Sequence, residues 1–106
     1  MSKKRTIVTI IFRVEVSFPR AREIIKNLCD KCAPHLAYKK YGTIKQENIK
    51  LWRNGMSYLV GYHGKDKQCS AVCSFFDAED ASLFEDYVDD YLNKHRELHE
   101  EIIHIE

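Results

Sequence analysis

The residues from Arg5 to Val16 alternate between two sets with a period of two, which is the spacing of side chains on opposite faces of a β-strand. One set is wholly apolar and comprises Val8, Ile10, Phe12, Val14 and Val16. The other set starts apolar at Ile7 and becomes charged at Arg13 and Glu15. Because the first half of the segment is apolar on both faces, we expect a central strand of a sheet.

A helical pattern follows this strand. Ser17 and Pro19 form a typical helix start, and the apolar residues that follow recur at helical spacing: Ile24, Ile25, Leu28 and Cys32. Pro34 is expected to end or kink the helix before a last turn toward Gly42.

Two hairpins are expected in the middle of the chain. Asn54-Gly55 lies between two apolar runs and is typical of a two-residue hairpin turn, in which both residues need a positive φ. That register places Lys50, Trp52 and His63 together on the face away from the core. A second turn within residues 64–67 places four further residues on the core face: Cys69, Ala71, Cys73 and Phe75.

The last part of the chain has a heptad-like apolar pattern from Phe84 onward. It predicts a helix from Ala78 to Ile105, roughly 42 Å long at 1.5 Å per residue. Strands of about six residues span only about 20 Å, so half of this helix overhangs the sheet. Its apolar seam therefore needs another partner, and we expect a homodimer that uses Tyr91, His95, Leu98 and Ile102.

The predicted fold is α+β, with an antiparallel sheet of about four strands, helices on one face, the order β-α-β-β-β-α and a long C-terminal helix. At 106 residues the chain is expected to form a single domain, 1–106, with residues 1–4 disordered. No stretch approaches the ~18 apolar residues of a membrane span. We therefore expect a cytoplasmic protein whose four cysteines are reduced.

Charge is distributed unevenly along the chain. Residues 1–67 carry a net charge of +10 and residues 68–106 a net charge of −9. The acids of the last helix include like-charge pairs four residues apart, which are mildly destabilising. Three sources of positive charge could compensate these acids: the basic first helix, the basic face of a second subunit or an external basic partner. The sequence predicts a protein partner with a basic surface, bound by Glu85, Asp86, Asp89 and Asp90.

The segment from Tyr38 to Lys67 interleaves five aromatic residues with seven bases. Single-stranded nucleic acids are bound in this way, because cations follow the phosphates while aromatic rings stack on bases. The candidate contacts are Lys39, Lys40, Lys50, Trp52, Arg53, His63 and Lys65. In the alternative interpretation, Trp52 packs against Ile7 and Ile11 in a small second core or a dimer interface, and the lysines are only solvated.

Metal binding and catalysis receive little support. Cys29, Cys32 and His35 have the spacing of zinc ligands, but the two cysteines lie in an apolar helical stripe and are better explained as core thiols. Cys69 and Cys73 lie roughly 13 Å apart along one strand, too far to share an ion. We expect no metal and no cofactor. There is no glycine-rich phosphate loop or G-x-S-x-G motif.

Two functional hypotheses follow. The first is a small intracellular, non-enzymatic protein-interaction module of the inhibitor or adaptor type, acting through the acidic C-terminal helix. The alternative is binding of RNA or single-stranded DNA by the basic aromatic hairpin 38–67. A small nuclease with His63 as general base and Lys65 holding phosphate is a remote third reading.

Overall fold

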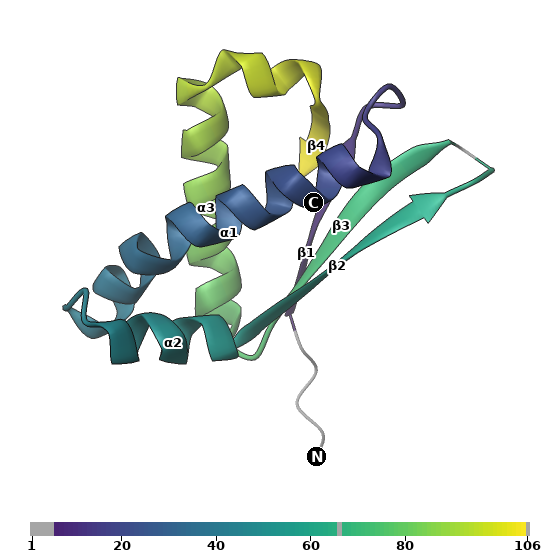
Figure 1. Ribbon diagram of the computed structural model, residues 1–106. Coiled ribbons are helices and arrows are strands. Elements are labelled where there is room, and N and C mark those ends of the chain that lie inside the picture. Colours follow the sequence, from purple (N-terminus) through teal and green to yellow (C-terminus); the bar gives the residue numbers. More distant parts are fainter. Residues whose placement is uncertain (1–5, 66, 106) are drawn as a thin grey trace.

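The computed structural model describes residues 6–65 and 67–105, so the predicted disorder of residues 1–4 lies outside the described residues. The order of elements is β1 (Thr6–Phe12), α1 (Phe18–Tyr41), α2 (Gln46–Asn54), β2 (Met56–His63), β3 (Gln68–Phe75), α3 (Ala78–Lys94), the 3-10 helix η1 (Arg96–Glu100) and β4 (Ile102–Ile105) (Figure 1). The described strands form one antiparallel sheet in the order β2-β3-β1-β4. The predicted α+β class is confirmed, but the predicted order of elements is wrong in two places.

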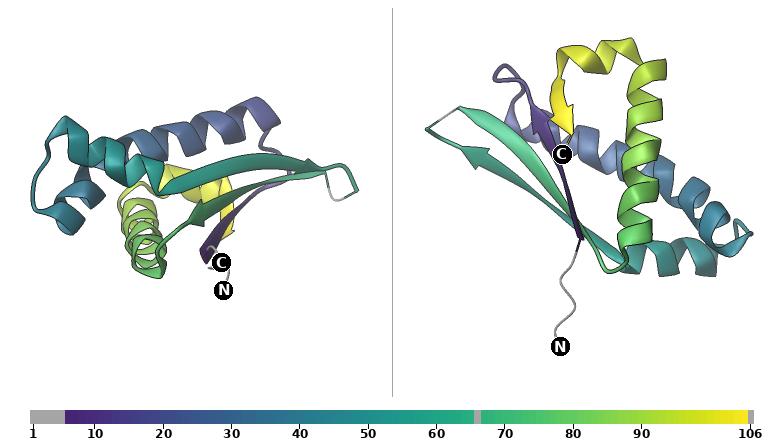
Figure 2. Two further views of the ribbon diagram at one scale, coloured as in Figure 1. Left: turned by 90° about the horizontal axis from the view of Figure 1, so that it is seen from below. Right: turned by 180° about the vertical axis from the view of Figure 1, so that it is seen from behind.

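The chain follows the split β-α-β connectivity of ferredoxin-like proteins, with α2 added before β2. β1 lies between β3 and β4, as predicted for a central strand. Helices α1 and α3 both lie on one side of the sheet (Figure 2). Because many unrelated functions use this arrangement, the topology alone does not assign one.

The core fills the space between the sheet and these helices. Val8, Ile10 and Phe12 of β1 are buried, in agreement with the period-two pattern, but the strand ends at Phe12 and not at Val16, and Val14 is exposed. The expected core face of β3 is also confirmed, since its four residues are fully buried: Cys69, Ala71, Cys73 and Phe75. The pairing of His63 with Gln68 fixes this register between β2 and β3.

Helix α1 begins and ends as the sequence indicates. The Ser17 side chain accepts a hydrogen bond from the Arg20 backbone N–H, which caps the first turn. At the other end Gly42 adopts φ 77°, a left-handed conformation that suits glycine, and its N–H donates to the carbonyl of Tyr38. The helix continues through Pro34 without ending there, and its last turn closes at Tyr41 and Gly42 as expected.

The predicted Asn54-Gly55 hairpin does not form. Residues 46–54 are helix α2, and Gly55 has φ −81°, whereas the predicted turn needs a positive value. Ile49 and Trp52 lie three residues apart and face the core from this helix. The Trp52 ring contacts Phe75 with a centroid distance of 6.3 Å, and Phe75 contacts Phe84 at 5.2 Å. This aromatic row attaches α2 to β3 and α3.

The predicted helix from Ala78 to Ile105 is also wrong beyond Lys94. Helix α3 ends there, and the chain turns back through η1 to form β4 beside β1. The β-branched residues at 102, 103 and 105 favour a strand. Pairing with β4 also satisfies the backbone groups along the edge of β1, which a projecting C-terminal helix would leave exposed to water. Ile102 is therefore buried in the monomer core.

An ion pair attaches this returning segment to α1. Arg20 donates from Nε to Oε2 of Glu101 at 2.7 Å and from Nη2 to Oε1 at 3.0 Å. These hydrogen bonds outweigh partial burial and lower the pKa of Glu101 below its ordinary value of 4.5. A lowered folded-state pKa means that the contribution to stability is complete above pH 4.5 and is lost as the pH falls through the folded-state pKa.

We therefore expect Glu101→Gln to destabilise the protein more at pH 7 than at pH 3. The loss should stay below about 1 kcal/mol, because water screens the half-exposed Arg20. Urea unfolding at both pH values measures the difference. Glu100→Gln is the control, since Glu100 forms no ion pair in the described part of the chain. An equal difference at both pH values would contradict the ion-pair explanation.

Candidate interaction surfaces

Part of the acidic charge is neutralised within the chain. Lys40 Nζ lies 3.0 Å from Asp77 Oδ2 and 2.8 Å from Asp80 Oδ2, and the Asp80 side chain is only 4% exposed. Burial opposes the charge of Lys40, but the hydrogen bonds to these carboxylates outweigh it and raise the pKa of the lysine. Compensation by the basic first helix, one of the three sources considered, therefore accounts for the start of α3.

The middle of α3 is not neutralised in this way. We define its acidic face as Glu85, Asp86, Asp89 and Asp90. Asp90 pairs with Lys94 at 3.0 Å, but both side chains are exposed. Among the described residues, no Lys or Arg forms an ion pair with the other three acids. The acidic face thus keeps most of its charge toward solvent.

The predicted nucleic-acid contacts are not brought together. Trp52 is 1% exposed and belongs to the core, so its predicted role in base stacking is wrong. Lys40 and Arg53 are engaged with Asp80 and with Asp30, respectively. The remaining candidates lie on different elements: Lys39 on α1, Lys50 on α2, Lys65 in the β2–β3 turn, and His63 on β2, 2.9 Å from Ser70 Oγ.

The predicted dimer seam does not exist as a helical stripe. Tyr91 lies in α3, where its hydroxyl accepts a hydrogen bond from Lys31. His95 is the residue that ends the helix, and Leu98 lies in η1. Ile102 is part of the core. The four residues therefore serve the fold of one chain, and the seam offers no argument for a dimer.

The cysteines are core thiols, as preferred from the sequence. All four are buried and free. Burial raises the pKa of Cys29 and of Cys73 to about 12, so both are protonated at neutral pH and are weak nucleophiles. Within residues 6–65 and 67–105, no group of three His, Cys, Asp or Glu residues is arranged to hold a metal ion.

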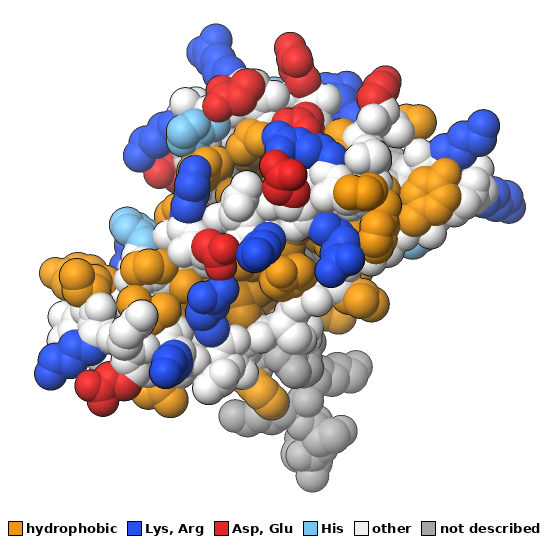
Figure 3. Space-filling model, viewed as in Figure 1, with side chains coloured by type: hydrophobic (Ala, Val, Ile, Leu, Met, Phe, Trp, Pro, Cys, Tyr) orange, Lys and Arg blue, Asp and Glu red, His pale blue; other side chains and the backbone are white. Residues whose placement is uncertain are grey.

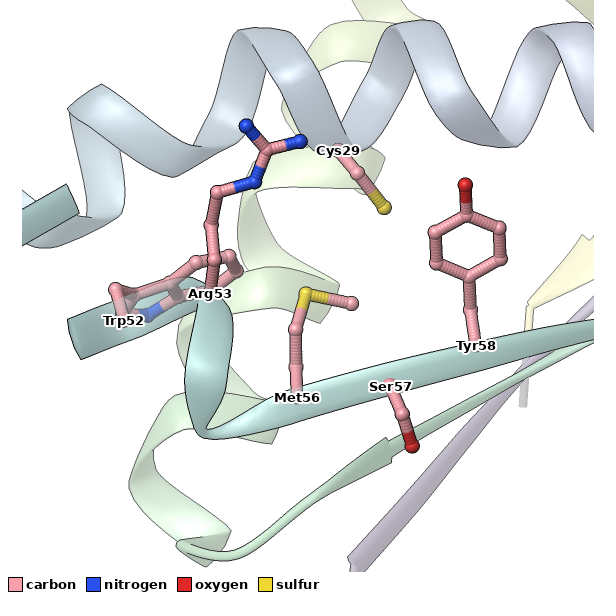
Figure 4. Close-up of a pocket in the computed structure, with 6 residues that line it drawn as sticks. All are labelled: Cys29, Trp52, Arg53, Met56, Ser57 and Tyr58. Carbon is pink, nitrogen blue, oxygen red and sulfur yellow. The ribbon is translucent and has the colours of Figure 1, made fainter. Parts of the chain in front are cut away.

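Two adjoining hollows lie between α1 and β2. One hollow of about 160 Å³ is lined by Cys29, Trp52, Arg53, Met56, Ser57 and Tyr58 (Figure 4). Figure 4 shows Cys29, Met56 and Tyr58 pointing into the space between the helix and the strand, whereas Ser57 points away. A second hollow of about 340 Å³ shares Tyr58 and is lined by Pro19, Arg22, Glu23 and Lys26. We call the two together the α1–β2 groove.

The groove carries excess positive charge. Arg53 is paired with Asp30, and Glu23 is paired with Arg20. Arg22 and Lys26 remain, and neither has a carboxylate partner in the described part of the chain. Figure 3 shows Lys and Arg side chains over α1, with hydrophobic side chains between them. The groove therefore combines an apolar floor with two available cations on its rim.

Strand β2 borders the groove and ends the sheet. In the described part of the chain it pairs only with β3, so its other side presents unpaired backbone groups. Edge strands are usually protected by charged side chains, proline or shortness. The sequence of β2, MSYLVGYH, has no proline and no Lys, Arg, Asp or Glu over eight residues. The opposite edge strand, β4, is only four residues long.

Comparisons with known proteins add no assignment. The chain matches no family model, no curated protein and no solved structure. Among the described residues, no helix is long and apolar enough to cross a membrane.

Proposed function

We propose that this protein is a non-enzymatic, cytoplasmic interaction module that binds an extended acidic segment of a partner protein in the α1–β2 groove. The observation that carries the proposal is the unprotected edge of β2 beside an apolar, basic groove. A nucleophilic role for the thiol in the groove is disfavoured, because burial raises the pKa of Cys29 to about 12 and keeps it protonated at neutral pH.

Strand addition explains how such a segment is held. An extended peptide that pairs with β2 satisfies the open backbone groups of this strand, which supplies affinity without regard to sequence. Its side chains alternate in direction, so every second one faces the groove. One apolar side chain enters the hollow beside Cys29 and Met56, and acidic side chains two residues away, on the same face of the peptide, meet Arg22 and Lys26.

The acidic face of α3 supports a second contact. Glu85, Asp86 and Asp89 form no ion pair among the described residues, although other acids of α3 do. A basic surface on a protein partner relieves this repulsion. The module then has two surfaces of opposite charge, which suits an adaptor.

Nucleic-acid binding is the weaker alternative. Its central aromatic residue, Trp52, is buried. The split β-α-β domains that bind RNA stack bases on aromatic residues of the sheet surface. Here the corresponding positions of β1 and β3 hold Ile, Thr, Ser and Val. Two available cations also neutralise few phosphates.

The test uses two labelled peptides. In the first, glutamates lie two and four residues on either side of a central leucine, with valine at the positions between, so that leucine and glutamate share one face. The second has lysine in place of glutamate. Fluorescence polarisation should show binding of the glutamate peptide alone, weaker at about 200 mM than at about 50 mM salt. Arg22→Gln combined with Lys26→Gln should reduce the affinity about tenfold, which corresponds to about 1.4 kcal/mol.

Lys39→Gln combined with Lys50→Gln is the matched control, because it removes the same charge from exposed positions outside the groove. It should leave peptide binding unchanged. Failure of the glutamate peptide to bind, or equal losses in both double variants, would reject the groove. Single-stranded RNA that binds to the wild type and is lost in the Lys39/Lys50 variant would establish the nucleic-acid alternative instead.

A further inference from the structure

The side of the sheet that faces away from α1 and α3 has an unusual composition. Its described positions on β1, β2 and β3 are residues 7, 9 and 11 of β1, residues 57, 59, 61 and 63 of β2, and residues 68, 70, 72 and 74 of β3. None of them is Lys, Arg, Asp or Glu, although charged residues make up 31% of the chain. The solvent side of an antiparallel sheet is normally polar. We call this surface the outer face.

The outer face carries a continuous apolar patch. Leu59 and Val72 are direct neighbours on adjacent strands, and Thr9 continues their row on β1. Ile7 and Ile11 flank this row. Leu59 is 73% exposed, Ile7 55% and Val72 37%. Exposed apolar patches of this kind on a folded chain mark interaction sites.

We infer that the outer face binds the outer face of a second copy of this chain, forming a symmetric dimer. Two uncharged faces meet without bringing like charges together, whereas a charged partner finds no opposite charge there. Self-association through the α1–β2 groove is disfavoured, because it would bring Arg22 and Lys26 of both copies together. The serine, threonine and glycine residues between the apolar ones allow two sheets to approach closely.

The size of the face indicates a reversible dimer. Eight residues at about 3.3 Å and strands about 4.8 Å apart give a flat area of roughly 400 Å² for β1, β2, β3 and the short β4. Counted on both copies this is about 800 Å², below the roughly 1,200 Å² at which standard interfaces begin, and it corresponds to weak, transient association. The dimer leaves the α1–β2 groove free, since the groove lies on the helix side of the sheet.

Sedimentation equilibrium over a dilution series tests this inference on the full chain. The 12.5 kDa chain should approach twice its mass at high concentration. Leu59→Lys and Ile7→Lys, on β2 and on β1, should each raise the dissociation constant at least about tenfold, because each buries an unpaired charge in the interface. Ile44→Lys is the matched control, since Ile44 is 68% exposed on the loop after α1, and it should leave the dimer unchanged.

Circular dichroism shows that each variant is folded before it is compared. A wild-type chain that stays monomeric at about 300 µM overturns the inference, because a dissociation constant near 1 mM or above corresponds to only about 4 kcal/mol of binding free energy. A dimer that Leu59→Lys disrupts and Ile7→Lys does not disrupt also overturns it, and assigns association to the edge of β2. Neither result depends on the peptide experiment, so the two proposals stand or fall separately.

Discussion

Replacing Trp52 with alanine is expected to lower the free energy of unfolding by about 3–5 kcal/mol, the range for removal of a large buried aromatic residue. The ring is 1% exposed and contacts Phe75, so its loss opens a cavity at the junction of α2, β3 and α3. Urea unfolding measures the change. Trp52→Phe should be milder, because it keeps an aromatic ring and removes an indole N–H that has no hydrogen-bond partner among the described residues.

The same residue provides a second measurement without substitution. Trp52 is the only tryptophan in the chain, so its fluorescence reports a single site. Its emission should shift to longer wavelength on unfolding, and iodide should quench it poorly in the folded protein. Ile44→Ala is the control for exposed apolar residues and should change stability little. Efficient quenching by iodide, or a loss of less than about 1 kcal/mol in the free energy of unfolding of Trp52→Ala, would show that Trp52 lies at the surface.

Lys40→Met should destabilise the protein by about 3 kcal/mol, the lower end of the range for breaking a buried ion pair. The substitution leaves the Asp80 carboxylate buried without its cation, and the lower end applies because Lys40 is still 22% exposed. Combining it with Asp80→Asn removes both charges. The double variant should therefore be more stable than the sum of the single effects indicates.

The comparison for this pair is Lys94→Met, which breaks an ion pair of the same helix at the surface. Exposed pairs four residues apart contribute about 0.5 kcal/mol or less. Similar losses for Lys40→Met and Lys94→Met would show that the burial of Asp80 has no energetic consequence. Additive effects of Lys40→Met and Asp80→Asn would likewise contradict direct pairing.

The middle of the chain shows how a strong local signal was overruled. Asn54-Gly55 predicts a hairpin only if both flanking segments are strands, and the preceding residues also have helical spacing, with Ile49 and Trp52 three apart. The aromatic row from Trp52 to Phe84 decides between these alternatives. It joins residues far apart in the sequence, so no local pattern could reveal it. Because of the same error, the sequence pattern places Trp52 on the surface, whereas it lies in the core.

The candidate groove was beyond sequence reasoning for a similar reason. Its residues come from α1, α2 and β2, and the apolar ones resemble ordinary core residues when read along the chain. The acidic face of α3 was visible at once, because it depends on residues within a few turns of one helix. The exposed edge of β2 depends on strand order, which only the pairing of β1 with β3 establishes.

The residue pattern was sufficient for features whose causes are local: the alternation of β1, the serine and glycine ends of α1, the β2–β3 turn and the α+β class. Long-range contacts decided the rest. The segment after Lys94 satisfies both a helical and a strand pattern, and the free backbone edge of β1 selects the strand. Once β4 occupies that edge, β2 is left as the long unprotected edge and the helices lie on one face. The groove and the uncharged outer face are consequences of this arrangement, because each is formed by residues that are brought together only when the sheet is complete.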